Sequence, residues 1–194
     1  MIKLKDLIVE ETKPAYEYGC VMLYFNPVKD FVAYQNTIKQ EDLYIADDNG
    51  GYGIETEPHC TLLYGLHEGV KVTDVSQILS EITFGDCVIH NPSLFENEKF
   101  DVLKFDVTYQ PAPYYNGLDF LHIANEKLNK LPNTQTYPDY HPHMTVAYLK
   151  PGLGKKYVAE LKKGVSAFGV RSTHIVYSQA DGTKTEIGIQ KSKN

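Results

Sequence analysis

Two heptapeptides in this sequence are nearly identical, and each places a histidine and a threonine one residue apart. Residues 58–64 read PHCTLLY, and residues 142–148, which lie 84 positions further along the chain, read PHMTVAY. With 7 histidines and 13 threonines in 194 residues, chance gives about 0.5 His-x-Thr matches, so one match alone carries no information. The proline and the tyrosine that both copies share make the repeat the strongest signal in the sequence.

The residues of the repeat can carry out acid–base chemistry on a phosphodiester. Alternate side chains of a β-strand point to one face, so His59 lies beside Thr61 and His143 lies beside Thr145, while the residues between them face a core. One neutral and one protonated imidazole can act as general base and general acid, and the hydroxyls can donate hydrogen bonds to phosphate oxygens. This set needs neither a metal ion nor a cofactor. The competing interpretation is that these histidines and threonines are ordinary strand residues with a structural role. It explains a single copy of the motif better than a matched pair.

Length and charge restrict the fold and the ligand. At 194 residues with 42% apolar content, the chain is predicted to form one domain over residues 1–194. The net charge of −6 disfavours long nucleic acid as a partner, whereas a small phosphorylated ligand can still bind in a locally positive cleft. No run of about 18 apolar residues predicts a membrane span, and three cysteines fit a reducing compartment. We expect a protein of the cytoplasm that has no membrane partner.

The segments around the repeats predict both strands and helices. Residues 19–25, GCVMLYF, are typical of a strand. A helical pattern after the first repeat begins at Thr73 or Asp74, either of which is a preferred N-cap residue. A second amphipathic helix is predicted to begin on Asp119.

Each repeat is preceded by a polar loop, at residues 46–58 and 132–142, and Asp181-Gly182 predicts a hairpin near the end of the chain. The order of these elements predicts a mixed α/β fold, bilobal and pseudosymmetric, with antiparallel hairpins as well as crossover connections. We expect both His-x-Thr strands to face one central cleft between two pseudo-equivalent lobes.

The two repeats resemble the motifs of the two-histidine (2H) phosphoesterase superfamily, whose members carry one His-x-Thr motif on each half of a bilobal α/β fold. Within that superfamily EPHCTLLYG, HPHMTVAYL and YSQADGTKT are most similar to bacteriophage anti-CBASS cyclic-oligonucleotide phosphodiesterases, over residues 18–189. The resemblance implies that His59, Thr61, His143 and Thr145 are catalytic. It also implies metal-independent hydrolysis of 3′-5′ bonds in cyclic di- and trinucleotides inside the cytoplasm of the infected bacterium.

Base recognition is predicted for four residues outside the repeats. Tyr137, in the loop before the second repeat, and Tyr18, before the first strand, are candidates for stacking on a base. Turn packing is the alternative explanation for Tyr137. Gln179 and Glu186, near the terminal hairpin, can contact a base edge or a ribose hydroxyl.

Two other functions fit the same motifs. One is RNA processing, by a 2′,3′-cyclic phosphodiesterase or a 2′-5′ RNA ligase-like enzyme; the acidic charge and the lack of a basic, aromatic tract weigh against it. The other is a non-catalytic protein that sequesters a cyclic nucleotide, although such a protein would not need both intact motifs. The preferred nucleotide, the division of acid and base roles, the nucleophile and the oligomeric state are left open by the sequence.

Overall fold

A computed structural model of the chain describes residues 16–26, 28–46, 52–109, 119–135, 139–164 and 167–191. The helices in these ranges are α1 (Lys29–Gln35), the 3-10 turn η2 (Gln40–Asp42), α2 (Val72–Ser80), α3 (Phe120–Leu128) and α4 (Gly154–Gly164). The strands are β1 (Gly19–Phe25), β2 (His59–Leu66), β3 (Thr83–Phe84), β4 (Cys87–Glu96), β5 (Asp101–Tyr109), β6 (His143–Leu149), β7 (Phe168–Val170), β8 (Ser172–Ser178), β9 (Lys184–Ile187) and β10 (Gln190–Lys191).

Eight of these strands form one sheet in the order β7-β4-β5-β6-β2-β1-β8-β9, and all of its strand pairs are antiparallel. β3 and β10 form a separate parallel pair. The two strands that begin with the motif histidines, β2 and β6, are neighbours at the centre of the sheet. The predicted mixed α/β fold is therefore confirmed.

The chain builds this sheet from two structural repeats, β1-α1-β2-α2-β4 and β5-α3-β6-α4-β8. A pseudo-twofold relation about the β2–β6 junction exchanges β1 with β5 and β8 with β4. The last strand of each repeat thus lies in the half of the sheet that the other repeat begins. A sequence pattern that treats each half of the chain as one lobe does not predict this exchange.

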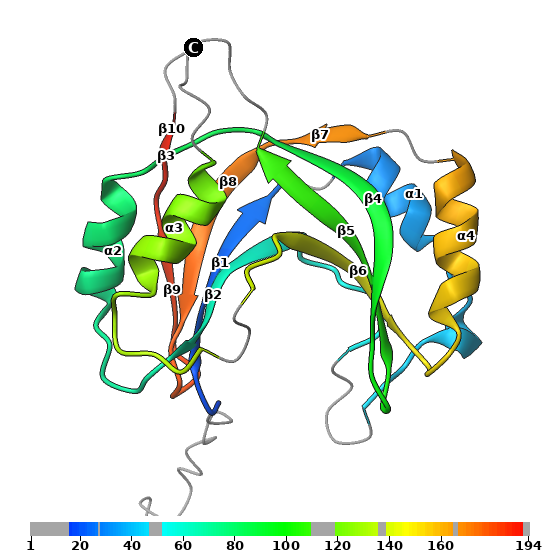
Figure 1. Cartoon of the computed structure of the whole chain (residues 1–194), viewed down its shortest axis with the longest axis horizontal. Helices are drawn as coiled ribbons and strands as arrows, with labels where there is room; N and C mark the ends of the chain where they lie inside the picture. Colours follow the sequence, from blue (N-terminus) through cyan, green and yellow to red (C-terminus); the bar gives the residue numbers. More distant parts are fainter. Residues whose placement is uncertain are drawn as a thin grey trace, which may run out of the picture.

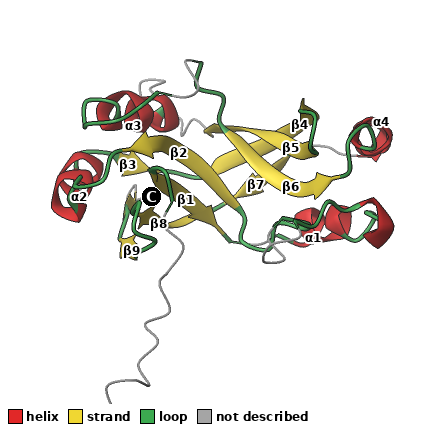
Figure 2. Ribbon diagram, turned by 90° about the horizontal axis from the view of Figure 1, so that it is seen from below, coloured by secondary structure: helices red, strands yellow, loops and turns green. Residues whose placement is uncertain are grey.

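We name two lobes by their elements. The first lobe contains β2, β1, β8 and β9 with α2 and α3, and the second contains β6, β5, β4 and β7 with α1 and α4. Figure 1 shows the sheet as an arch, with α2 and α3 along one flank and α1 and α4 along the other. The view from below places the helix pairs of the two lobes at opposite ends of the molecule (Figure 2). The concave side of the arch lies between the lobes.

The core lies on the helix side of the sheet, and the motif strands follow the predicted alternation. Cys60, Leu62, Met144 and Val146 all have a relative exposure of 0%. They pack in one apolar cluster with side chains of the helices, including Phe31. The residues between the motif positions therefore hold β2 and β6 in place from behind.

The predicted helix starts are confirmed in one case and wrong in another. Asp119 caps α3, because its Oδ1 accepts a hydrogen bond from Leu121 N at 2.9 Å. α2 begins at Val72 instead, with Lys71 as its N-cap and no side-chain cap hydrogen bond. Thr73, expected to be a cap, donates to Asp74 instead (3.4 Å), so both candidates lie inside the first turn.

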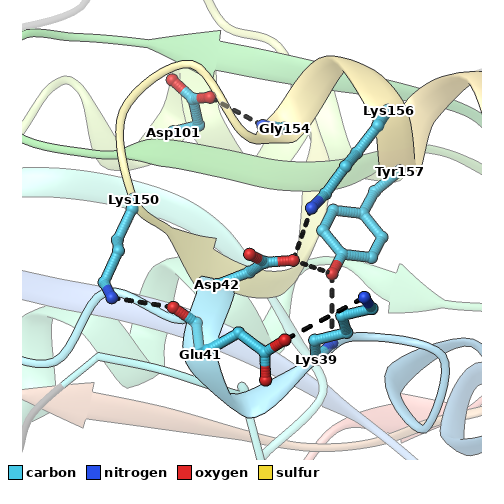
Figure 3. Close-up of polar contacts among 8 residues, drawn as sticks. All are labelled: Lys39, Glu41, Asp42, Asp101, Lys150, Gly154, Lys156 and Tyr157. Atoms are coloured by element: carbon cyan, nitrogen blue, oxygen red, sulfur yellow. Dashed lines mark hydrogen bonds and ion pairs between the residues drawn. The ribbon is translucent and has the colours of Figure 1, made fainter.

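A polar network attaches α4 to η2 and to the start of β5 (Figure 3). Asp42 of η2 accepts hydrogen bonds from Lys156 Nζ at 2.6 Å and from Tyr157 Oη at 2.5 Å. Asp101, the first residue of β5, accepts a hydrogen bond from Gly154 N at 2.9 Å, where α4 begins. The hydrogen bond from Lys156 is the largest of the effects that lower the pKa of Asp42.

Candidate active site

The two motif strands meet at a single residue pair, Cys60 opposite Met144. Both of these side chains point into the core, so their neighbours along each strand point to the other face of the sheet. Because β2 and β6 are antiparallel, Thr61 lies across from His143, and His59 lies across from Thr145. The fold therefore brings the four predicted catalytic residues together at the middle of the sheet, on the concave side of the arch.

The two histidines are held in the same way. His59 Nδ1 is 2.7 Å from the carbonyl oxygen of Glu57, and His143 Nδ1 is 2.8 Å from that of His141. A carbonyl oxygen only accepts, so Nδ1 carries a hydrogen in each ring and donates it. The neutral ring then presents an unprotonated Nε2, which can accept a proton, and the charged ring presents Nε2–H, which can donate one.

A β-bulge in each motif strand explains why the repeat extends to its tyrosine. In β2 the pairing with β1 skips Leu62, and in β6 the pairing with β5 skips Val146. One extra residue reverses the alternation, so the tyrosine three places after each threonine returns to the threonine's face. Tyr64 and Tyr148 accordingly line the same cavity as the two threonines.

A helix-borne amide satisfies the carbonyl group of each bulge. Asn125 of α3 donates from Nδ2 to Leu62 O at 2.7 Å, and Gln35 of α1 donates from Nε2 to Val146 O at 3.2 Å. A bulge leaves one residue outside the strand ladder, and the Asn125 amide supplies a partner for the Leu62 oxygen. The Val146 oxygen also accepts from Glu55 N at 3.1 Å, and Gln35 Nε2 joins the same segment by donating to Glu55 O at 2.5 Å. α1 and α3 occupy equivalent places in the two structural repeats, so the amides are also equivalent.

A cavity of about 760 Å³ opens over the motif residues. Its lining includes Thr61, His143 and Thr145, together with side chains of both lobes and of the β4–β5 hairpin. His59 is half-buried beside it, with its ring centroid 5.4 Å from that of Tyr24. The volume lies within the range that ligand pockets of small molecules occupy, roughly 300–1,000 Å³.

The second lobe carries an ion pair next to its motif, made by a buried lysine and a partly exposed aspartate. In β5, Lys104 pairs with Thr145 and Asp106 pairs with His143. Lys104 is 5% exposed; its Nζ lies 2.7 Å from Asp106 Oδ1 and 4.6 Å from the centroid of Phe95. A cation and an anion therefore stand in register with the threonine and the histidine.

The first lobe has no such pair at the equivalent places. In β1, Met22 pairs with Thr61 and Tyr24 pairs with His59. The Tyr24 ring lies between two imidazoles, stacked on His174 with a centroid distance of 4.9 Å and tilted against His59. Both imidazoles therefore have an aromatic neighbour, because Phe95 contacts His143 edge-on with a centroid distance of 4.9 Å. His143 has the Lys104–Asp106 pair in register with its motif as well.

The pKa of the His143 imidazole is lowered from its usual value, chiefly by burial. The hydrogen bond to the His141 carbonyl and the charge of Asp106 oppose the shift, while the charges of Lys104 and His59 reinforce it. A lowered pKa keeps this ring neutral near pH 7. His143 is therefore available to accept a proton at Nε2.

The nearby thiols are not suited to nucleophilic attack. Burial raises the pKa of Cys60 to about 12, and its side chain points into the core. Burial also raises the pKa of Cys20, which lines the cavity beside Thr61, to about 12. Both thiols stay protonated near neutral pH, and the thiolate is the reactive form.

The residues predicted to recognise a base are less closely gathered. Tyr137 falls outside the described residues. Tyr18 contacts Tyr64 edge-on, with a centroid distance of 5.9 Å, so it reaches the cavity only through that ring. Gln179 lies in the β8–β9 connection, Glu186 is exposed on β9, and neither is among the described residues that line the cavity. Their roles remain predictions.

Several residues around the cavity were not predicted from the sequence. Lys104 and Asp106 interrupt the apolar strand segment VLKFDV two positions apart, and this spacing places them on the same face. That spacing is visible in the sequence, but only the pairing of β5 with β6 shows that the two side chains lie next to the motif.

Among the described residues, no group of three or more His, Cys, Asp or Glu side chains is placed to hold a metal ion. No helix in the described ranges is long and apolar enough to cross a membrane.

Comparison with known proteins identifies the fold and no more. No family model matches the sequence, and no curated protein matches it. The structure is similar to that of Usb1 from Kluyveromyces marxianus, with a TM-score of 0.52 and 8% identity over 90% of this chain and 99% of Usb1. The chain shares the fold of Usb1. A structure of the same Usb1 with uridine monophosphate gives a TM-score of 0.52 and 8% identity over 89% of this chain and 99% of that one.

Proposed function

We propose that this protein is a phosphodiesterase of the 2H type that cleaves 3′-5′ bonds in cyclic di- and trinucleotides. The observation that carries the proposal is the meeting of two His-Thr pairs across the β2–β6 junction, with both rings fixed through Nδ1. Two Nε2 atoms on one face can move two protons, one at the attacking oxygen and one at the leaving oxygen. The threonine hydroxyls can stabilise the charge that develops on the phosphate oxygens.

The nucleophile in this proposal is the ribose 2′-hydroxyl next to the scissile phosphate. His143 Nε2 takes the 2′-hydroxyl proton while the 2′-oxygen bonds to phosphorus, and the bond from phosphorus to the 5′-oxygen breaks. The leaving 5′-oxygen takes a proton from His59 Nε2, which gives a 2′,3′-cyclic phosphate and a free 5′-hydroxyl. The intramolecular attack has the proximity advantage that a free water lacks.

A second step opens the cyclic phosphate and restores the enzyme. His59, now neutral, takes a proton from a water molecule whose oxygen attacks phosphorus. His143, now charged, returns its proton to the departing 2′-oxygen. The lowered pKa of His143 supports its assignment as the first base, since it begins neutral and gives up its proton readily.

The net charge of −6 supports a small cyclic substrate over a long polyanion. The sequence resemblance supports a role in removing CBASS signal nucleotides from the cytoplasm of a phage-infected bacterium. A second candidate, cleavage at an RNA end, has one observation in its favour. It is the likeness in fold to Usb1, for which a structure with uridine monophosphate exists.

One assay tests the proposal. The purified protein is incubated with cyclic dinucleotides, a cyclic trinucleotide, a short oligouridylate and 2′-deoxy analogues of each, and the products are identified by mass spectrometry. We expect linear products from the cyclic ribonucleotides, none from the 2′-deoxy analogues, and none in the double variant His59→Ala/His143→Ala. Cleavage of the oligouridylate alone supports the RNA candidate. Binding without products supports a sequestering protein, and cleavage of the 2′-deoxy analogues at the ribonucleotide rate overturns the 2′-hydroxyl step.

A further inference from the structure

We propose that Tyr52, Phe100 and Tyr148 form a stacking subsite for one nucleobase on the second-lobe wall of the cavity. All three line the cavity that holds His143 and Thr145. This inference rests on the proposed function in one respect, that the ligand is a nucleotide. It adds a binding place for a base. None of the residues that form it was predicted from the sequence to recognise a base.

The three rings form one aromatic cluster with tilted and edge-on contacts. The ring centroids are 4.8 Å apart for Tyr52 and Tyr148, 5.2 Å for Tyr52 and Phe100, and 5.5 Å for Phe100 and Tyr148. Tyr44 packs behind them, 5.6 Å from Tyr52 and 5.2 Å from Phe100. The ring that faces a ligand is thus supported by others, which limits the conformational entropy lost on binding.

Tyr52 has two features that packing alone does not explain. Its side chain is 49% exposed although it belongs to an aromatic cluster, and its φ of 76° is in the left-handed region. A non-glycine residue rarely adopts that conformation, and it persists where the surroundings hold it. Here the pairing of Tyr52 with Ile45 and the 2.8 Å bond from Tyr148 N to Gly53 O hold the backbone. The strained backbone presents an aromatic ring at the cavity.

The distance from the subsite to the motif threonine matches the distance from a phosphate to the base of the same nucleotide. Tyr148 is on the same strand face as Thr145, because the bulge at Val146 realigns them. In β5 their partners are Val102 and Lys104, two positions apart, which corresponds to roughly 7 Å along a strand. A phosphate at the threonine hydroxyl can therefore carry its base to the aromatic cluster.

The opposite end of the cavity has a different chemistry. Around Tyr64 it is lined by the amide side chains of Asn129 and Gln135, next to Asn125, whose own amide is bonded to Leu62 O and to Asn129 Nδ2. Amides read the hydrogen-bonding edge of a base, whereas an aromatic ring stacks on any base. The aromatic subsite should accept a base with little regard to its identity, and base selectivity should come from the amide end.

The test uses the His59→Ala variant, which prevents turnover, and a fluorescent dinucleotide, 2-aminopurine riboside linked 3′-5′ to uridine. Stacking on an aromatic ring quenches 2-aminopurine, so fluorescence reports both binding and stacking. Adding Tyr52→Ala should weaken binding about 5- to 150-fold, the usual range for losing one base–aromatic stack, and should reduce the quench. Tyr52→Phe should stay within about twofold of the parent.

Tyr16→Ala is the matched control, because Tyr16 is 51% exposed and is not among the described residues that line the cavity. It should change neither affinity nor quenching. Unchanged binding and quenching in both Tyr52→Ala and Phe100→Ala would overturn the subsite, and a circular dichroism spectrum of each variant checks its fold. If no nucleotide is cleaved by the wild type yet Tyr52→Ala weakens the probe, the subsite stands and the phosphodiesterase proposal fails. If the wild type cleaves a cyclic nucleotide and Tyr52→Ala changes neither cleavage nor probe binding, the phosphodiesterase proposal stands and the subsite fails.

Discussion

The two lobes present the same pair of predicted catalytic residues, a histidine and a threonine, next to different neighbours. In each lobe a histidine donates from Nδ1 to a carbonyl oxygen, a threonine follows two places later, and a helix-borne amide caps a bulge. The neighbouring strand differs: β5 supplies Lys104 and Asp106 where β1 supplies Met22 and Tyr24. The comparison shows how a duplicated motif can become asymmetric without any change in the motif itself.

The difference matters because phosphodiester cleavage needs one base and one acid. Taking the Lys104 ammonium out of water costs desolvation free energy, and its attraction to the partly exposed Asp106 carboxylate often fails to recover that cost. A pair present in one lobe only can instead tune one of two otherwise equal imidazoles. We interpret Lys104 and Asp106 as positioning residues for His143.

The largest expected effect comes from removing either histidine. His59→Ala and His143→Ala should each lower kcat/KM on a cyclic dinucleotide by about 10³-fold or more, since each removes a proton-transfer group. Product formation followed by chromatography measures the loss. A third variant, His67→Ala, serves as the control, because His67 is exposed and is not among the described residues that line the cavity. Near-wild-type activity in either motif variant would contradict the site.

Removing a threonine hydroxyl tests whether the lobes contribute equally to charge stabilisation. Thr61→Ala and Thr145→Ala should each lower kcat by about 10²- to 10³-fold, the usual loss for a transition-state donor, with little change in KM. Thr→Ser at the same positions keeps the hydroxyl and should retain most of the activity. A rise in KM with kcat unchanged would show that the hydroxyls bind the ground state as tightly as the transition state, which would contradict the mechanism.

Replacing Lys104 by the residue of the other lobe tests the source of the asymmetry. Lys104→Met removes a cation that lowers the pKa of His143 and leaves Asp106, which raises it, so that pKa should rise. A base must be neutral, so the acidic limb of the kcat/KM profile should move to higher pH. We expect a loss of roughly three- to tenfold at pH 6 and less than twofold at pH 8.5.

Met22→Leu is the matched control for that experiment, because Met22 holds the equivalent place beside Thr61. Its pH profile should coincide with that of the wild type. An acidic limb that does not move in Lys104→Met, in protein that melts as a folded domain, would remove the ion pair from the account.

The smallest expected effects concern the bulges. Asn125→Ala and Gln35→Ala each remove a hydrogen bond to a bulge carbonyl, which should lower the free energy of unfolding by about 0.5–1.5 kcal/mol. Urea denaturation measures the change, and Gln77→Ala on the exposed face of α2 is the control. A loss in both variants supports the structural equivalence of the two amides, and no loss in either would contradict it. The two losses need not be equal, because Val146 O keeps its bond from Glu55 N at 3.1 Å and Gln35 also donates to Glu55 O.

The sequence predicted the parts of the site that are local. The alternation of His59 and Thr61 along a strand, the strand at residues 19–25 and the Asp119 cap follow from neighbouring residues alone, and the structure has each of them. The bulge at Leu62 and its contact with Asn125 depend on strand register and on a helix 63 residues away. Those long-range relations leave no local pattern.

The role of Lys104 shows the same limit. A lysine in an apolar strand has no assigned meaning until the strand order places it beside β6. The exchange of β4 and β8 between the lobes is equally invisible to periodicity. Prediction from the sequence therefore identified the two His-Thr pairs that the fold brings together and missed the neighbouring groups that differ between the lobes.

The most direct test of this asymmetry uses a substrate whose leaving group needs no acid. In uridine 3′-(4-nitrophenyl phosphate), the 2′-hydroxyl still requires a base, but 4-nitrophenolate departs without a proton. The account predicts that His59→Ala cleaves this substrate within about tenfold of the wild-type rate, whereas His143→Ala remains about 10³-fold slower. Rescue of His143→Ala in place of His59→Ala, or equal losses in both variants, would contradict it.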